Sequence, residues 1–168
     1  MSSDLRSAGL PPVGSEDHVR GEGPEAVVYF DLACPHCAAS WMRIRELPLR
    51  ICFRHFPVAS KHPRAPALHA AAEAAALQGR FWEMCDSIYL DQGHIDDPHL
   101  WERARTLELD LDRLERERRS DPLAERVRRD FESGIRAGVA GTPAAFVDGR
   151  PLKGEIERAL ASLALSAN

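Results

Sequence analysis

Apolar and polar residues follow distinct patterns along the chain, and each pattern predicts one type of element. Residues 26–30 form a short apolar run rich in β-branched and aromatic side chains, which is typical of a buried strand. Residues 49–56 alternate apolar and polar side chains with the period of two expected of a second strand. Between them, a segment without a helix breaker runs from the cysteines at 34 and 37 to Pro48 and predicts a helix. The order strand, helix, strand indicates a βαβ unit with a parallel sheet.

Residues 63–138 have a helical pattern throughout. An alanine-rich segment ends at Gly79, and later segments repeat apolar residues every three or four positions. Asp97 and Asp121 each stand before a proline, an arrangement that predicts an acidic N-cap at a helix start. We expect this stretch to be an all-helical insertion.

The strand pattern returns near the end of the chain. Residues 144–147 are apolar, and Asp148-Gly149 is a strong signal for a hairpin turn. Residues 150–153 are expected to form the returning strand, and residues 154–165 the last helix. The predicted order is therefore βαβ, a helical insertion, and ββα.

These elements predict two domains preceded by an arm. Residues 1–24 contain four glycines and three prolines without any period, so we expect a flexible N-terminal arm. An α/β domain is expected in two segments, 25–62 and 139–168, with the helical domain 63–138 inserted between them. A chain of 168 residues is long enough to bury such a core without disulfides.

Composition narrows the class of protein. The chain is 44% hydrophobic and 29% charged, close to globular averages. Its longest apolar runs are far shorter than the ~18 residues of a membrane span, and a net charge of −4 gives no sign of nucleic-acid binding. The first residues lack a basic region followed by an apolar one, so we expect the cytoplasm. A cysteine pair there is typically metal-binding or redox-active.

The motif Cys34-Pro35-His36-Cys37 is the main candidate for chemistry. At a strand-to-helix junction, Cys34 would lie among the unpaired N–H groups and the positive dipole end of the helix, which stabilise a thiolate. Pro35 suits the first helical turn, and His36 adds a polar, potentially cationic neighbour. The same spacing also occurs in half of a zinc site, but the cytosolic βαβ context favours redox chemistry.

A second motif, Gly141-Thr142-Pro143, stands immediately before the third strand. Alone it would be an ordinary loop proline. Together with the cysteine motif it resembles the DsbA-like branch of the thioredoxin superfamily, over about residues 17–165. The matching residues are Asp31, Cys34-Pro35-His36-Cys37, Arg54-His55-Phe56-Pro57, Phe81-Trp82-Glu83-Met84, Gly141-Thr142-Pro143 and Phe146-Val147-Asp148-Gly149.

This resemblance implies a thioredoxin fold and a protein-disulfide oxidoreductase that needs no cofactor. It implies that Cys34 is the attacking thiol, that Cys37 resolves the mixed disulfide, and that Pro143 is cis beside them. The backbone at Gly141, Thr142 and Pro143 would pair with an extended substrate, and the helical insertion would overhang the site. The implied partners are proteins with thiols or disulfides, and a recycling partner or small thiol.

Two features depart from the family pattern. DsbA-like proteins usually act outside the cytoplasm, and many carry a buried acidic residue six positions before the first cysteine. Here that position is Val28, which cannot accept a proton. We therefore expect slow resolution by Cys37, and the net direction (oxidase, reductase or isomerase) stays open.

The other cysteines and the histidines are expected to have structural roles. Cys52 and Cys85 are expected in the core, as free cysteines commonly are. His55 is assigned to the polar side of its strand, His62 to a loop and His69 to the alanine-rich helix, and their spacing matches no metal site. Two alternatives from other classes remain: a zinc module built on the CxxC pair, and a redox-silent peptide-binding adaptor. The sequence identifies neither the substrate nor the oligomeric state.

Overall fold

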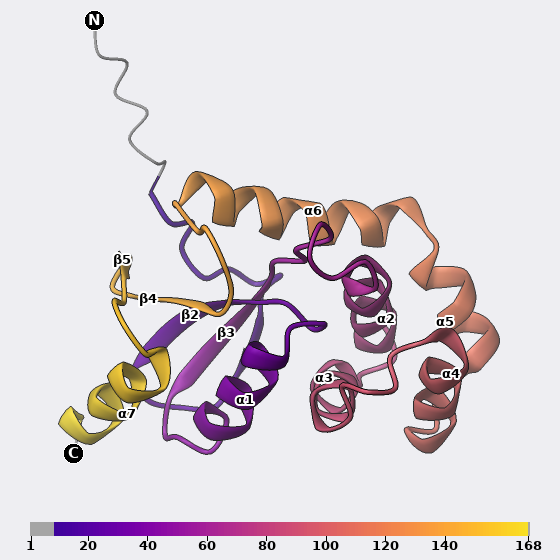
Figure 1. Cartoon of the computed structure of the whole chain (residues 1–168), viewed down its shortest axis with the longest axis horizontal. Coiled ribbons are helices and arrows are strands. Elements are labelled where there is room, and N and C mark those ends of the chain that lie inside the picture. Colours follow the sequence, from indigo (N-terminus) through magenta and orange to yellow (C-terminus); the bar gives the residue numbers. More distant parts are fainter. Residues whose placement is uncertain (1–8, 168) are drawn as a thin grey trace, which may run out of the picture.

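A computed structural model describes residues 9–167, which form a five-stranded mixed sheet and a set of helices (Figure 1). The strands are arranged in the order β1-β3-β2-β4-β5. β2 at the centre pairs in parallel with β3 and antiparallel with β4. The strand bounds are β1 His18–Arg20, β2 Glu25–Phe30, β3 Arg50–His55, β4 Ala144–Val147 and β5 Arg150–Pro151.

Seven helices complete the described part of the chain, and Figure 1 shows most of them grouped to one side of the sheet. α1 crosses from β2 to β3, and α7 follows the β4–β5 hairpin and contacts α1. The long helix α6 leads from the helical group back to the sheet. The helix bounds are α1 Pro35–Ile44, α2 Ala65–Ala76, α3 Phe81–Leu90, α4 Asp97–Thr106, α5 Leu111–Arg118, α6 Asp121–Arg136 and α7 Ile156–Ser166.

The central strands of the sheet are buried on both faces, and β2 shows this most clearly. Val28 and Phe30 belong to a large core shared with α1, α2, α3 and α7. Val27 and Tyr29, which point the other way, belong to a smaller core that includes Phe131 of α6. A strand covered on both faces needs a continuous apolar run, which is the pattern that residues 26–30 display.

The predicted flexible arm is wrong for residues 9–24, whereas residues 1–8 lie outside the described part. His18–Arg20 forms β1, which pairs antiparallel with β3. The glycines that suggested flexibility are required for close packing instead. Gly21 and Gly23 have positive φ, and a Cβ at either position would collide with a backbone carbonyl oxygen of Leu49 or Pro48.

Two element boundaries also differ from the sequence expectations. The N-cap of α4 is Asp96, whose carboxylate accepts from the His99 N–H, and α6 is preceded by Ser120. Each predicted aspartate cap is thus the first helical residue. β5 covers only two of the four residues expected for the returning strand.

No helix in residues 9–167 is both long enough and apolar enough to cross a membrane.

Candidate active site

The end of β2 and the start of α1 form the junction that carries the cysteine pair. Cys34 is the N-cap of α1, with extended backbone angles, and Pro35 occupies the first helical turn. The Cys37 N–H donates a hydrogen bond to Cys34 Sγ at 3.4 Å, as a capping side chain accepts from the first turn. The sequence prediction that the helix begins at the cysteines is confirmed.

Hydrogen bonds at this junction stabilise the thiolate of Cys34. The Cys37 side chain makes the largest contribution to lowering the pKa of Cys34 to about 5. Burial acts in the opposite direction, but the Cys37 and His36 amides and the Thr142 side chain also favour the charged form. Cys34 is therefore ionised at neutral pH.

Cys37 has the opposite character. Its side chain is fully buried, and this burial, together with the neighbouring Cys34, holds the pKa of Cys37 far above its ordinary value. The Asp31 N–H donates to Cys37 Sγ at 3.5 Å, but this single amide does not offset the burial. The two cysteines thus form a thiolate–thiol pair.

The loop before β4 meets the cysteine pair. The Thr142–Pro143 peptide bond is cis, in agreement with the resemblance. The Thr142 side chain lowers the pKa of both cysteines, so the two sequence motifs, more than a hundred residues apart, lie together. Gly141 and His36 are both exposed. His36 lowers the pKa of Cys34 through its backbone amide.

Asp31 organises this junction, a role that the sequence alone did not assign. Its carboxylate accepts hydrogen bonds from the Ala33 and Val58 N–H groups, both at 2.9 Å. Its carbonyl oxygen accepts from the Tyr89 hydroxyl at 3.0 Å and from the Cys34 N–H at 3.2 Å. The position of an acidic residue between a buried strand and the cysteine motif is the sequence signal that could have indicated this role.

The other cysteines and Val28 lie in the interior. Cys52 and Cys85 are fully buried, as expected, and burial raises the pKa of both thiols. Val28 has no exposed surface and pairs with Phe53 and Ala145.

The assignment of His55 to the polar side of its strand is wrong. His55 is fully buried, on the same face of β3 as Phe53, and its ring lies edge-on to the Phe53 ring. His69 is also fully buried in α2, whereas His62 lies in a loop as predicted. The Nδ1 atoms of His55 and His69 are 2.6 Å apart, so these histidines do belong to a cluster.

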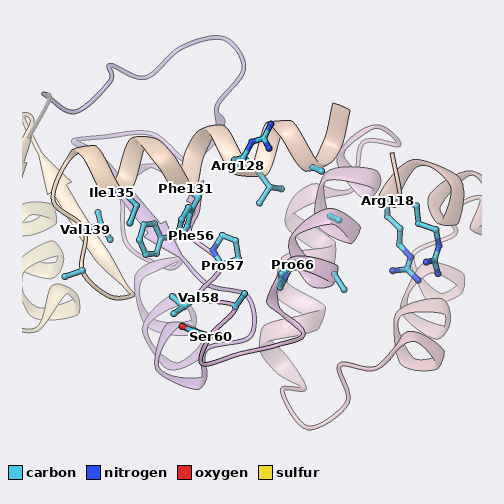
Figure 2. A pocket seen from close by; sticks show the side chains of 17 residues that line it. Phe56, Pro57, Val58, Ser60, Pro66, Arg118, Arg128, Phe131, Ile135 and Val139 are labelled. Carbon is cyan, nitrogen blue, oxygen red and sulfur yellow. The ribbon is translucent and has the colours of Figure 1, made fainter. Parts of the chain in front are cut away.

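An apolar groove of about 840 Å³ runs between α6 and the loop that follows β3 (Figure 2). Phe131 and Ile135 extend from α6 toward Phe56 and Val58, and the rings of Phe56 and Phe131 are 4.6 Å apart. Val139 lines the groove and precedes Thr142 by three residues. Ile135 is 53% exposed, so the groove presents apolar surface close to the cis-proline loop.

Comparison with known proteins assigns the chain to a family. The family described as DSBA-like thioredoxin domain matches residues 48–162. The chain therefore belongs to the DsbA-like thioredoxin-fold proteins. The matched stretch begins after the cysteine pair, so the site itself rests on the geometry above.

Solved structures of the same fold cover nearly the whole chain. A thioredoxin-like oxidoreductase from Silicibacter pomeroyi DSS-3 superposes with a TM-score of 0.79 at 20% identity, covering 99% of this chain and 96% of that one. The thiol-disulfide exchange protein alpha-DsbA2 from Wolbachia pipientis gives 0.80 at 16% identity, covering 98% and 91%. BdbD from Bacillus subtilis gives 0.75 at 15% identity, covering 95% and 98%.

Curated relatives with higher identity are much longer proteins. The chain is 38% identical to the Na(+)/H(+) antiporter NhaA 3 of Salinispora tropica over 94% of its own length, but it covers 26% of that protein. It is 36% identical to the Na(+)/H(+) antiporter NhaA of Herminiimonas arsenicoxydans over 99% of its length, covering 28%. The chain thus spans about a quarter of these relatives, and ion exchange is named for those whole proteins.

Proposed function

We propose that the protein is a thiol–disulfide oxidoreductase that exchanges disulfides through Cys34 and Cys37. The observation that carries this proposal is the thiolate–thiol pair, with Cys34 ionised at the N-terminus of α1 and Cys37 protonated behind it. Thiolates are the nucleophiles of disulfide exchange. The family membership and the oxidoreductases among the structural neighbours support the same chemistry.

The reaction proceeds in two exchanges. The Cys34 thiolate attacks one sulfur of a substrate disulfide, forms a mixed disulfide, and releases the other substrate sulfur as a thiolate. Cys37 then loses its proton and attacks Cys34 Sγ, which forms the Cys34–Cys37 disulfide and releases the second substrate sulfur. The substrate gains two electrons, one proton from Cys37 and a second proton from solvent, and the oxidised protein performs the reverse reaction on a dithiol. The redox state of the surroundings sets the net direction.

A zinc module built on the same pair fits this geometry less well. Zinc binds cysteines as thiolates, and the burial of Cys37 strongly favours its neutral thiol.

Trapping the mixed disulfide tests the proposal. In Cys37→Ser the first exchange proceeds but resolution cannot, so we expect covalent adducts with disulfide-containing proteins that dithiothreitol releases. The matched control is Cys34→Ser/Cys37→Ser, which should form none. Adducts that are equally abundant in the control, or absent from both variants, would contradict the proposed function.

We further propose that the substrate is an extended protein segment whose apolar side chains occupy the groove beside the cis-proline loop. The groove is open and lined mainly by apolar side chains, with Arg118, Arg119 and Arg128 also in its wall, and Val139 in its lining is close in the chain to Thr142. Ile135→Asp should raise KM for a protein disulfide while leaving the rate with a small disulfide unchanged. Leu165→Asp is the control, because Leu165 is 75% exposed on α7 and does not line the groove. Equal KM values in the two variants would remove the groove from substrate binding.

A further inference from the structure

A second cluster of ionisable side chains lies in the interior, outside the cysteine site. His18 on β1, His55 on β3 and Glu73 on α2 place one ligand-type atom each within 4.8 Å of the others. His18 Nε2 and His55 Nε2 both lie 2.6 Å from the same carboxylate oxygen, Glu73 Oε1. Three elements that are distant in the sequence therefore converge on one point.

The Glu73 carboxylate has no arginine or lysine within ion-pair distance in residues 9–167, although Arg126 attracts it from farther away. Burial alone would raise the pKa of Glu73, but hydrogen bonds from His18 and His55 outweigh it and hold the pKa well below its usual range. Glu73 is therefore a carboxylate although it is only 7% exposed. Its ion-pair partners in this part of the chain are these two histidines. A buried anion of this kind is stabilised by a cation.

The imidazole rings of His18 and His55 each have a further contact that fixes their orientation. The His18 ring stacks on Phe81, with ring centroids 3.6 Å apart and an interplanar angle of 9°. The other ring nitrogen of His55, Nδ1, is hydrogen-bonded to His69 Nδ1 at 2.6 Å. Metal-binding histidines typically have such a partner on the second nitrogen, which fixes the ring orientation.

We propose that His18, His55 and Glu73 form a binding site for a divalent transition-metal cation, with Zn²⁺ as the matching ion. Two imidazole nitrogens and one carboxylate oxygen are the protein ligands of zinc sites that keep a fourth position open. His18 keeps 18% of its side chain exposed, which provides access and room for a water ligand. With metal–ligand bonds of about 2.0–2.2 Å, the ligand atoms must move apart to roughly 3.3 Å. His18 can make this movement because β1 is the edge strand.

Zinc binding changes which ring nitrogen carries the hydrogen in His55 and in His69. The Leu32 N–H donates to His69 Nε2 at 2.9 Å, so neutral His69 carries its hydrogen on Nδ1 and donates it to His55 Nδ1. His55 then carries its hydrogen on Nε2, which points at Glu73. A metal on this Nε2 moves the hydrogen to Nδ1 of His55 and forces His69 to carry its own on Nε2. No proton leaves these two neutral rings.

Asp31 can accept the hydrogen that moves to Nε2 of His69. Asp31 Oδ1 lies 3.6 Å from His69 Nε2 and can receive the relocated N–H after a small movement. The Leu32 N–H, two residues before Cys34, loses its acceptor in exchange. Occupation of the metal site therefore acts on the segment that leads into the cysteine motif.

Calorimetric titration with Zn²⁺ tests the site in a Cys34→Ser/Cys37→Ser background, which removes binding by the cysteine pair. We expect one tight zinc per chain. Adding His18→Ala should weaken binding by more than about 100-fold, the upper end of what loss of a second-shell partner costs. Glu73→Gln, which keeps the shape but not the charge, should do the same. The control His94→Ala/His99→Ala removes an exposed histidine pair, with ring centroids 4.5 Å apart, and should bind zinc like its parent.

Spectroscopy on the Cys34→Ser/Cys37→Ser protein keeps the test independent of how the ligand variants fold. Co²⁺ should give the visible bands of a four-coordinate nitrogen–oxygen site without the near-ultraviolet thiolate band. In ¹⁵N NMR, zinc should move the hydrogens of His55 and His69 to the opposite ring nitrogens and speed hydrogen exchange at the Leu32 amide. Absence of a stoichiometric zinc site, equal affinity in His18→Ala and its parent, or unchanged histidine tautomers would each overturn the proposal.

Discussion

The four cysteines occupy two regions of the molecule that differ less in exposure than in hydrogen bonding. Cys52 on β3 and Cys85 on α3 are fully buried, and burial raises the pKa of Cys52 to about 12. Cys34 at the start of α1 is itself only 8% exposed, yet its pKa is lowered to about 5. Burial alone would therefore not distinguish Cys34 from Cys52 and Cys85. The donors at the helix N-terminus are what separate Cys34 from the other two.

Cys37 shows how local this effect is. It lies in the first turn of α1, three residues from Cys34, but it points into the core, where burial outweighs the effects of the Asp31 N–H and the Thr142 side chain. Its pKa is raised, as in the interior cysteines. One turn of helix therefore places a nucleophile and a protected resolving thiol side by side.

The largest expected effect is on activity. Cys34→Ser should reduce disulfide reductase activity to background, because serine provides no thiolate for the first exchange. Cys52→Ala and Cys85→Ala should retain the activity of the parent protein. A turnover assay on a model disulfide measures all three, and substantial activity in Cys34→Ser would break the distinction between the two regions.

Alkylation rates should separate the regions by more than about a thousandfold at pH 6, where Cys34 is a thiolate and Cys52 and Cys85 are neutral and enclosed. The rate at Cys34 should be constant above about pH 6 and fall about tenfold per pH unit below pH 5, since the thiolate is lost as pH falls through its pKa. Mass spectrometry after brief alkylation measures the site and rate. Labelling of Cys85 at a rate similar to that of Cys34 would contradict the comparison.

The raised pKa of Cys37 should limit the second exchange, and Val28 is where family relatives often carry a carboxylate. Val28→Glu should speed resolution of the mixed disulfide by about 100-fold, the low end for a positioned acid–base group. It should also destabilise the fold, because a polar group enters the core. Val28→Gln is the matched control, with similar size but no proton to exchange. Stopped-flow resolution rates that are equal in the two variants would show that a carboxyl group here has no effect.

The smallest effect concerns stability at the interior cysteines. Cys85→Ala should lower the free energy of unfolding by about 1–2 kcal/mol, because it leaves a small cavity among packed side chains. The pKa of Cys34 should not change. Chemical denaturation measures the first quantity and the pH dependence of alkylation the second; a shifted Cys34 pKa would mean that the two regions are coupled.

The sequence determined most of the cysteine site because its parts are local. The N-cap position of Cys34, the proline in the first turn and the apolar strand before them all lie within about a dozen residues. Helix capping and hydrophobic periodicity act over that range. The junction with Thr142-Pro143 was predicted only through the family resemblance, since that loop follows the cysteines by more than a hundred residues.

The tertiary structure alone decided the roles of the histidines and of residues 9–24. His55 was assigned to the polar side of its strand, whereas it lies on the face of Ile51 and Phe53, and only the packing of α2 brings His69 and Glu73 against it. Gly21 and Gly23 looked flexible, and they instead allow β1 to lie against the chain before β3. His18, His55 and Glu73 are separated by 37 and 18 residues and show no common spacing. They meet because strand pairing and the packing of α2 against the sheet bring distant positions together, and no pattern of neighbouring residues encodes that geometry.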